Sequence, residues 1–406
     1  MFQRRVPLAW RNLVHNKRRL MLSVAGIAFA VVLMFTQQGF YYTLLDSTAE
    51  LIHRMDADLV LVSPRRRMLT TPQPIEYRFI LQAAGNPSVV SVEPVYLEFV
   101  QSKLRTGKRS PRLIRVIAFD LTKPVIEFPA LTSDMIAKLQ HPGTAMIDRR
   151  SKSKYFPLPF DDATRMSQMP VELNNREVQI VGSFDLGTDF INTGNLLMSS
   201  QNLASYFPRR LGRFDDPLHT VDIALIKLRS ESNADEVRGQ LLEQMQVGRQ
   251  RSNQQQPIRR VDVLTKQQFL EREQNYWRKG TPIGFVFTLG QGLGFFVGVV
   301  ICYQIIFSGL SDLQAEFATV KAIGYRNRFL VGQVFAQSIY LAVFGFVPGC
   351  IISAGLFHVL SSETGLIMEM VTSRAAYVFL ATLVMCLVSG GLAVRKILKL
   401  DPAELF

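Results

Sequence analysis

The groups of residues that could perform chemistry in this chain are incomplete. The segment Gly182-Ser-Phe-Asp-Leu-Gly187-Thr188 has the glycine spacing of a phosphate-binding loop, but no lysine follows its second glycine. Because that lysine contacts the phosphates, a loop without it is a poor candidate for a nucleotide site. We interpret the segment as a turn at the end of a strand.

The metal-binding and nucleophilic patterns are equally incomplete. Asp215, Asp216, His219 and Asp222 could be read as metal ligands, but no second histidine or cysteine lies near them in the sequence. A structural or catalytic metal usually takes several such ligands at short spacing. No Ser-His-acid grouping is readable either. We therefore expect no cofactor, no metal and no catalytic residue in this chain.

Apolar residues, which make up 48% of the 406, gather in a few long runs. Four runs contain no Asp, Glu, Lys or Arg: Leu20–Tyr42, Ile283–Leu310, Phe329–Leu360 and Ala375–Val394. Each is long enough for a helix to cross about 30 Å of hydrocarbon, whereas the buried core helices of soluble proteins are usually shorter. The sequence predicts an α-helical membrane protein with four transmembrane helices.

The net charge of +13 would suit nucleic-acid binding, but its distribution indicates a membrane protein instead. Lys and Arg are in excess in residues 1–19, 311–328 and 395–406. Such an excess in short segments marks the cytoplasmic side of a membrane. We therefore expect a multi-pass inner-membrane protein with both termini inside and residues 43–282 and 361–374 outside, in contact with lipid and not with nucleic acid.

The large exterior segment predicts an α+β domain without disulfides, because all three cysteines fall in the apolar runs. Its β-rich stretches are 58–63, 113–119, 177–184 and 221–228, and its helical stretches are 133–140, 202–207, 233–246 and 265–279, with Asn233 as an N-cap. The predicted organisation is therefore a cytoplasmic amphipathic segment 1–19, a first span 20–42 read as an uncleaved anchor, a periplasmic domain 43–282, spans 283–310, 329–360 and 375–394, a cytoplasmic loop 311–328, a periplasmic loop 361–374 and a cytoplasmic tail 395–406.

The loop between the second and third spans has the marks of a short helix. Ser311 and Gln314 form a capping-box pattern, Lys321 suits the carboxyl end of a helix, and Gly324 is a natural stop. Leu313, Phe317 and Val320 share one apolar stripe. Such a helix could lie on the membrane surface as a connector, or fit a groove on a cytosolic partner, and the residues alone leave both alternatives open.

The uncharged residues of the spans predict packing between helices. Gly290, Gly294 and Gly298 recur every four residues, a spacing that lets helix backbones approach closely within the chain or at a dimer seam. The polar residues in the spans are better suited to bonds between helices than to a conduit: Gln37, Gln38, Gln291, Gln304, Gln333, Gln337 and Ser338. Because buried charges normally mark a transport pathway, we expect no alternating-access route through these spans.

Several segments resemble the FtsX/MacB type of ABC transporter permease. These are Ala315–Tyr325, which reads A-E-F-A-T-V-K-A-I-G-Y, the tail Asp401-Pro-Ala-Glu-Leu405 and the N-terminal Trp10-Arg-Asn-Leu13. The stretches Gln274–Trp277, Thr281–Phe285 and Ile301–Ile305 are most similar to the DevC branch, the permease of the cyanobacterial heterocyst glycolipid exporter. The resemblance covers the membrane part and both tails.

This resemblance implies a MacB-like exterior domain and a coupling helix that is seated in a cytoplasmic ATPase. The implied coupling residues are Asp312, Glu316, Phe317, Val320, Lys321, Gly324 and Tyr325. ATP and Mg would be bound by a separate DevA-like ABC ATPase. A homodimer of this chain, a DevB-like periplasmic adaptor and a TolC-like outer-membrane protein would complete the assembly.

The implied function is force transmission across the membrane. ATP binding in the partner would draw two coupling helices together and move the exterior domain, which would expel a lipid-like cargo, such as a glycolipid, through the adaptor and tunnel. An alternative is an FtsX-like subunit that uses the same movement to activate a periplasmic hydrolase. A membrane-anchored exterior enzyme is the least favoured alternative.

Overall fold

A computed structural model describes residues 17–160, 162–210, 216–246, 260–312 and 327–398, and these form two compact units. The first unit, called here the bundle, comprises Met1–Tyr42, Pro282–Leu360 and Met368–Phe406. The second, called here the domain, comprises Thr43–Thr281 together with Ser361–Ile367. The loop between the last two long helices therefore divides, and its first half belongs to the domain.

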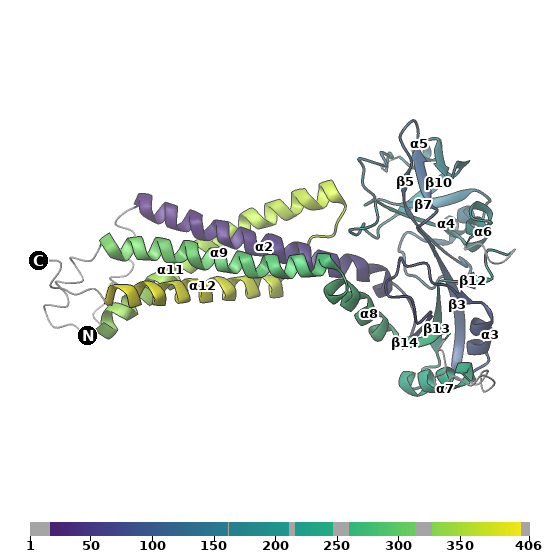
Figure 1. Ribbon diagram of the computed structural model, residues 1–406. Helices are drawn as coiled ribbons and strands as arrows, with labels where there is room; N and C mark the ends of the chain where they lie inside the picture. The colour runs from purple at the N-terminus through teal and green to yellow at the C-terminus, as the bar shows by residue number, and fades with distance from the viewer. Residues whose placement is uncertain (1–16, 161, 211–215, 247–259, 313–326, 399–406) are drawn as a thin grey trace, which may run out of the picture. The chain divides into compact units, whose positions relative to one another are not determined.

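Four long helices supply the bundle (Figure 1): α2 (Lys17–His53), α9 (Pro282–Asp312), α11 (Asn327–Thr364) and α12 (Thr372–Leu398). Each contains a stretch long and apolar enough to cross a membrane. They include the four charge-free runs, so the predicted fold class is confirmed on its helical side.

The bundle helices contact one another through aromatic and apolar side chains. The ring of Phe35 on α2 lies 6.0 Å from that of Phe346 on α11, which in turn lies 5.0 Å from Phe379 on α12. Phe40 stacks on Phe287 of α9 at 5.9 Å. In lipid such packing is the main contribution to helix association, because the lipid tails are as apolar as the side chains.

A mixed sheet of eight strands forms the centre of the domain, in the order β10-β7-β11-β6-β3-β13-β1-β14. Their bounds are Gln179–Phe184, Thr144–Asp148, Asn195–Ser199, Arg115–Phe119, Val89–Glu98, Ile223–Leu228, Leu59–Val62 and Asp262–Thr265. The pairs β10–β7 and β11–β6 are parallel, and the others are antiparallel.

Two smaller sheets and six helices complete the described part of the domain. The sheets are β5-β4-β8-β9 (Arg112–Leu113, Lys103–Thr106, Val171–Leu173, Arg176–Glu177) and β12-β2 (Thr220–Val221, Ile75–Glu76). The helices are α3 (Arg78–Ala84), α4 (Ser133–Leu139), α5 (Ala163–Ser167), α6 (Ser200–Tyr206), α7 (Ala234–Gln246) and α8 (Lys266–Lys279). This mixture confirms the α+β expectation.

Successive side chains of the central strands point to opposite faces of the large sheet and form an apolar core on each face. Leu59 and Leu61 of β1 lie in one apolar cluster, while Val60 and Val62 lie in the other. Successive side chains of a strand point to opposite faces, so a sheet that is covered on both sides has nearly continuous apolar strands. With no cysteine between residues 43 and 282, these two cores stabilise the domain without disulfides.

Local capping explains where the last domain helices begin. The side chain of Asn233 accepts the N–H of Asp235 at 3.0 Å, which confirms the predicted cap of α7. Thr265 and Gln268 form a reciprocal capping box at the start of α8. Such a box satisfies two backbone donors that a helix end otherwise leaves without partners.

Candidate functional site

The predicted coupling segment connects α9, which ends at Asp312, to α11, which begins at Asn327. The other predicted coupling residues lie outside the described residues: Glu316, Phe317, Val320, Lys321, Gly324 and Tyr325. So do most of the N-terminal segment 1–19 and the motif Asp401–Leu405. The coupling role of these residues stays a prediction.

Two of the three predicted packing glycines lie at close contacts within the chain. A Cβ atom on Gly290 would come within 2.5 Å of the Gln37 amide on α2. One on Gly298 would overlap the Met385 side chain of α12. A Cβ on Gly294 would meet nothing within 4 Å. The first two glycines therefore allow α9 to pack closely within the chain.

A second glycine pair, on α11, was not singled out from the sequence. A Cβ on Gly345 would overlap Ile27 of α2, and one on Gly349 would lie 2.7 Å from Val31 and 3.0 Å from the carbonyl oxygen of Ala28. These glycines have the same four-residue spacing that drew attention to α9, so the signal was present in the sequence.

The polar side chains of the bundle form the expected hydrogen bonds between helices only in part. Ser389 of α12 donates across to the Val299 carbonyl of α9 at 2.8 Å, but Ser338 donates within its own helix to Val334. Gln38 and Gln291 instead line a pocket between α2, α9 and α12.

In the domain, residues 361–367 pack against the turn after β10. The backbone N–H of Thr188 donates to the Gly365 carbonyl at 3.3 Å, and its hydroxyl donates to the Thr364 carbonyl at 3.1 Å. The Thr43 hydroxyl donates to the Ile367 carbonyl at 3.4 Å. Because α11 ends at Thr364, the last four residues of that helix belong to the domain.

Two glycines permit the close approach of this loop. Gly187 and Gly365 have φ values of +100° and +72°, a region that side chains with a Cβ rarely adopt. A Cβ on Gly187 would lie 2.9 Å from Ile367, and one on Gly365 would overlap the Arg150 carbonyl. The predicted turn at a strand end is confirmed for the residues after Phe184, whereas residues 182–184 are the end of β10 itself.

A buried carboxylate holds this turn from inside the domain. Asp148 accepts the N–H groups of Leu186 at 3.2 Å and Gly187 at 2.9 Å, and the side-chain amide of Asn195 at 2.7 Å. Burial raises the pKa of Asp148, while these hydrogen bonds oppose the increase. The bonds fix the backbone on which the 361–367 loop rests.

An ion pair continues this network on the other side of Asn195. Arg115 donates to the Asn195 side-chain oxygen at 2.8 Å and pairs with Asp189 at 3.2 Å. Asp189 also accepts the backbone N–H groups of Ile191 and Asn192. Both ends of the turn are therefore anchored to strands of the large sheet.

A separate cluster surrounds Asp222, the last residue of the incomplete metal pattern. Its carboxylate pairs with the guanidinium groups of Arg66 and Arg210, all almost fully buried, and Arg210 lies 3.6 Å from Glu98. Burial lowers the pKa of Arg66 to about 9 and that of Arg210 to about 10. Asp222 thus balances two buried cations, which assigns it a structural role.

Glu273 secures α8, the helix that precedes the second span. Its carboxylate accepts the Leu69 backbone N–H at 2.7 Å and the Trp277 indole N–H at 2.9 Å. Burial is the largest cause that raises the pKa of Glu273 to about 7, and the two hydrogen bonds oppose it. The sequence reading did not single out this residue, although Glu273 and Trp277 stand one helical turn apart on α8.

All four bundle helices lead into the domain by short routes along the chain. α2 continues as one helix beyond Tyr42 to His53. α8 ends at Lys279, and α9 begins at Pro282. α11 and α12 meet the domain through the docked loop 361–367. No bundle helix among the described residues is separated from the domain by a long linker.

Comparisons with known proteins place this arrangement among permeases. Residues 20–244, more than half of the chain, match the model of the MacB-like periplasmic core domain, and residues 291–402 match the FtsX-like permease C-terminal region. A search of curated proteins finds no match.

The chain is also similar to solved structures. The periplasmic region of MacB from Actinobacillus actinomycetemcomitans is 12% identical, with a TM-score of 0.35, and the match covers 55% of this chain and 96% of that one. The extracellular domain of the noncanonic ABC-type transporter YknZ from Gram-positive bacteria is 10% identical with a TM-score of 0.33, covering 52% and 99%. A domain of a putative permease from Porphyromonas gingivalis is 12% identical with a TM-score of 0.33, covering 52% and 88%.

Proposed function

The chain belongs to the family of ABC transporter permeases with a MacB-like periplasmic core domain and an FtsX-like C-terminal region, and from this premise we propose that it transmits force from a cytoplasmic ATPase to its periplasmic domain. The family implies an inner-membrane protein and an ABC ATPase partner. The proposal adds that both termini are cytoplasmic and that ATP and Mg are bound in a separate, DevA-like chain.

The observation that carries this proposal is the attachment of every bundle helix to the domain. α2 enters it as a continuous helix, α9 follows α8 after a short break, and the loop between α11 and α12 is hydrogen-bonded to Thr188. A displacement of the bundle helices would therefore act on the domain at three places. Long flexible linkers would not transmit such a displacement.

The input would come through the segment 311–325 on the opposite side of the membrane. Only a short stretch separates α9 from α11, so a push on that stretch acts on two long helices at once. Glu316, Phe317 and Lys321 would contact the ATPase, and Gly324 would end the coupling helix. Two copies of this chain would bring two such segments to an ATPase dimer.

The output would be export of a lipid-like cargo. The DevC resemblance supports a glycolipid, passed from the periplasmic side through a DevB-like adaptor to a TolC-like outer-membrane protein. In this scheme the cargo does not cross the membrane between the spans, because the described spans contain no buried acidic or basic side chain.

The test uses the full chain purified with its ATPase, comparing wild type with Glu316→Ala and Lys321→Ala. Loss of a contact worth about 1.4 kcal/mol lowers an affinity about tenfold, so we expect ATPase co-purification and export to fall by roughly that factor. Arg395→Ala, which removes a cation of the same predicted side, is the matched control.

Wild-type ATP hydrolysis and export in both variants would contradict the coupling assignment. Co-purification of a murein hydrolase in place of an adaptor would replace export by signalling as the output, while leaving force transmission intact.

A further inference from the structure

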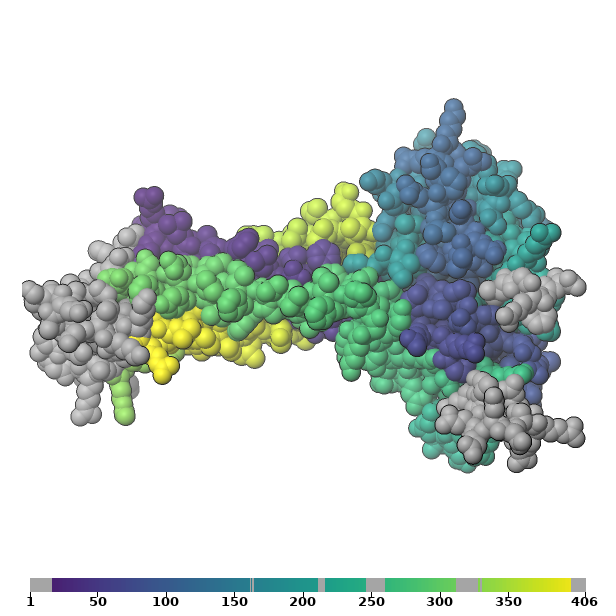
Figure 2. Space-filling view, in the orientation of Figure 1, coloured from purple at the N-terminus to yellow at the C-terminus, as the bar shows by residue number. Residues whose placement is uncertain are grey.

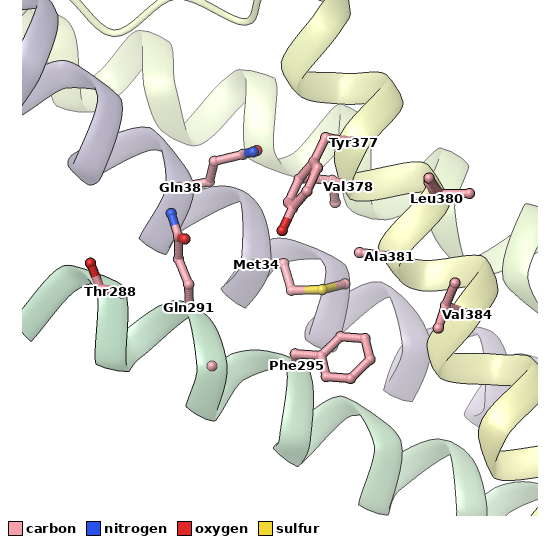
Figure 3. Close-up of a pocket in the computed structure, with 11 residues that line it drawn as sticks. Met34, Gln38, Thr288, Gln291, Phe295, Tyr377, Val378, Leu380, Ala381 and Val384 are labelled. Atoms are coloured by element: carbon pink, nitrogen blue, oxygen red, sulfur yellow. The ribbon is translucent and has the colours of Figure 1, made fainter.

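A pocket of about 490 Å³ lies within the bundle between α2, α9 and α12 (Figure 3). Most of its lining is apolar: Met34, Gly292, Phe295, Val378, Leu380, Ala381 and Val384. Four lining residues carry hydrogen-bonding groups: Gln38, Thr288, Gln291 and Tyr377. This volume and this composition are typical of ligand pockets, which are mostly apolar with a few polar groups.

The pocket is a groove with a buried floor and an exposed rim. Met34 and Gln38 of α2 are 7% and 5% exposed, whereas Tyr377 and Leu380 of α12 are 62% and 58% exposed. The α9 surface is visible along the bundle in Figure 2, and it presents further exposed apolar side chains such as Phe296. A molecule dissolved in the bilayer could therefore enter the groove from the side.

Two amides in this groove have no partner in the protein. Within the described residues, no protein group forms a hydrogen bond with the side chain of Gln38 or Gln291, whereas the Thr288 hydroxyl bonds its own helix at Gly284. Figure 3 shows the two glutamine side chains on neighbouring helices at the same end of the pocket. An unpaired polar group in hydrocarbon costs several kcal/mol, so these amides point to a ligand with hydrogen-bonding groups.

Polarity changes along the groove as it does across a lipid leaflet. At about 1.5 Å per residue, Gln38 and Thr288 lie roughly 6–9 Å from the domain-side ends of their helices in the bundle. Met34 and Phe295 lie roughly 12–20 Å from those ends. Half of a bilayer core measures about 15 Å, so the groove matches one leaflet in depth.

From this we propose that the groove between α2, α9 and α12 binds one lipid of the leaflet next to the domain, with its hydrocarbon chain against Met34 and Phe295 and its ester, amide or hydroxyl groups bonded to Gln38 and Gln291. The phenol of Tyr377, whose hydroxyl points into the groove in Figure 3, provides a third donor at the rim.

The dimensions favour a lipid chain over a helix from a second copy. An α-helix about 10 Å across occupies roughly 400 Å³ per turn, so a groove of about 490 Å³ takes in little more than one turn of a helix. A hydrocarbon chain is much thinner. Water is a poor occupant, because cavities with mostly apolar walls stay dry.

Gly292 provides a way to close the groove. Gly292 lines the groove and a Cβ on it would meet nothing within 4 Å, so Gly292→Leu adds a bulky side chain to the groove wall at a position with room for its Cβ. Gly355 on α11 is equally open and does not line the groove, which makes Gly355→Leu the matched control.

The experiment reconstitutes the full chain in phosphatidylethanolamine vesicles that contain phosphatidylglycerol with a mid-chain diazirine. After irradiation we expect labelling concentrated in peptides 288–295 and 377–384, and reduced at least about fivefold by Gly292→Leu but unchanged by Gly355→Leu, since a fivefold change corresponds to about 1 kcal/mol. Even labelling of all exposed apolar faces, or equal labelling in both variants, would overturn the proposal.

Gln38→Leu tests the polar half of the site. It should lower the labelling about threefold to tenfold, because a hydrogen bond contributes about 1 kcal/mol, yet raise the melting temperature of the delipidated chain by removing an unpaired amide. A purely structural Gln38 would give the opposite change in melting temperature. No ATPase takes part, so this result is independent of the proposed force transmission.

Discussion

The domain and the bundle are stabilised by different kinds of contact. In the domain, buried charges form directional pairs between distant segments, as Arg66 and Arg210 do with Asp222. In the bundle, the helices meet mainly through glycine surfaces and aromatic rings, although Ser389 donates a hydrogen bond across to the Val299 carbonyl of α9. Directional pairs specify one arrangement, whereas apolar surfaces allow small shifts at lower cost. We therefore expect substitutions at buried ion pairs of the domain to cost more than substitutions at helix contacts of the bundle.

The largest expected effect is the loss of the domain's central ion pairs. Asp222→Asn would leave the buried Arg66 guanidinium without its ion-pair partner and Arg210 with Glu98 alone, and breaking a buried pair costs about 3–5 kcal/mol. We expect a fall of that size in the free energy of unfolding, measured by urea denaturation in detergent with Trp277 fluorescence in a Trp10→Phe background.

The half-exposed pair of Arg105 and Glu172 is the control for this experiment. Because exposed pairs contribute about 0–1 kcal/mol, Arg105→Ala should change little. If Asp222→Asn costs no more than Arg105→Ala, the contrast between domain and bundle loses its basis.

The next largest expected effect is a pH dependence of the free energy of unfolding, which comes from a buried carboxyl group of the domain. Burial raises the pKa of Glu273 from an ordinary value of 4.5 to about 7, so the folded chain holds a proton that the unfolded chain has lost. The stability that protonated Glu273 contributes is fully present below about pH 4.5 and is lost as the pH rises to about 7. The free energy of unfolding should therefore fall by about 3 kcal/mol over this range.

Glu273→Gln should therefore flatten the pH dependence of the free energy of unfolding between about pH 4.5 and 7. The measurement is the denaturation midpoint across this range. Glu271→Gln, an exposed position on the same helix, should leave the wild-type slope unchanged. Parallel slopes in wild type and Glu273→Gln would show that another group titrates.

A third substitution should weaken the docking of the 361–367 loop without lowering the stability of the whole domain. Gly365→Ala forces a positive φ on a residue with a Cβ, which costs about 1–2 kcal/mol, and brings that Cβ against the Arg150 carbonyl. We expect faster hydrogen exchange at Thr188 and residues 361–367, with the melting temperature of the rest of the domain nearly unchanged. Unaltered exchange at Thr188 would mean that the loop is not docked there.

The smallest expected effect concerns the bundle. Gly349→Ala would press a methyl group on Val31 and on the Ala28 carbonyl, and such overpacking costs about 1–3 kcal/mol, of which a shift of the Val31 side chain should relieve a part. The melting temperature in detergent should fall by a few degrees, and it should not fall for Gly355→Ala. A loss as large as that of Asp222→Asn would show that the bundle is as rigid as the domain.

Local signals in the sequence were sufficient to predict much of the fold. The absence of charge over twenty residues or more predicts each span, and Asn233 and Thr265 mark the starts of α7 and α8 through their own side chains. The strand β3 was not predicted, because Glu93, Pro94 and Glu98 interrupt its apolar pattern. The two glutamates are nevertheless buried, since Lys123 and Arg210 lie beside them.

The candidate site could not be predicted to the same extent, because it is formed by contacts that no local sequence pattern reveals. Thr188 and Thr364 are 176 positions apart, and only the folded domain brings them together. Gln38 and Gln291 were recognised as polar residues of spans, but their shared pocket requires the packing of three helices. The closely packed pair Gly345 and Gly349, by contrast, carried a spacing that the sequence could have revealed.

The uninterrupted course of α2 from Lys17 to His53 limits how this chain can change in length. Each residue inserted between Thr43 and Leu51 would rotate the helix beyond it by about 100°, so Thr43 could not keep its hydrogen bond to Ile367 while Leu51 and Ile52 keep their places in the domain core. Seven residues would restore the phase almost completely. Related chains should therefore vary in length here by whole helical turns, whereas the break at Gly280 imposes no such periodicity.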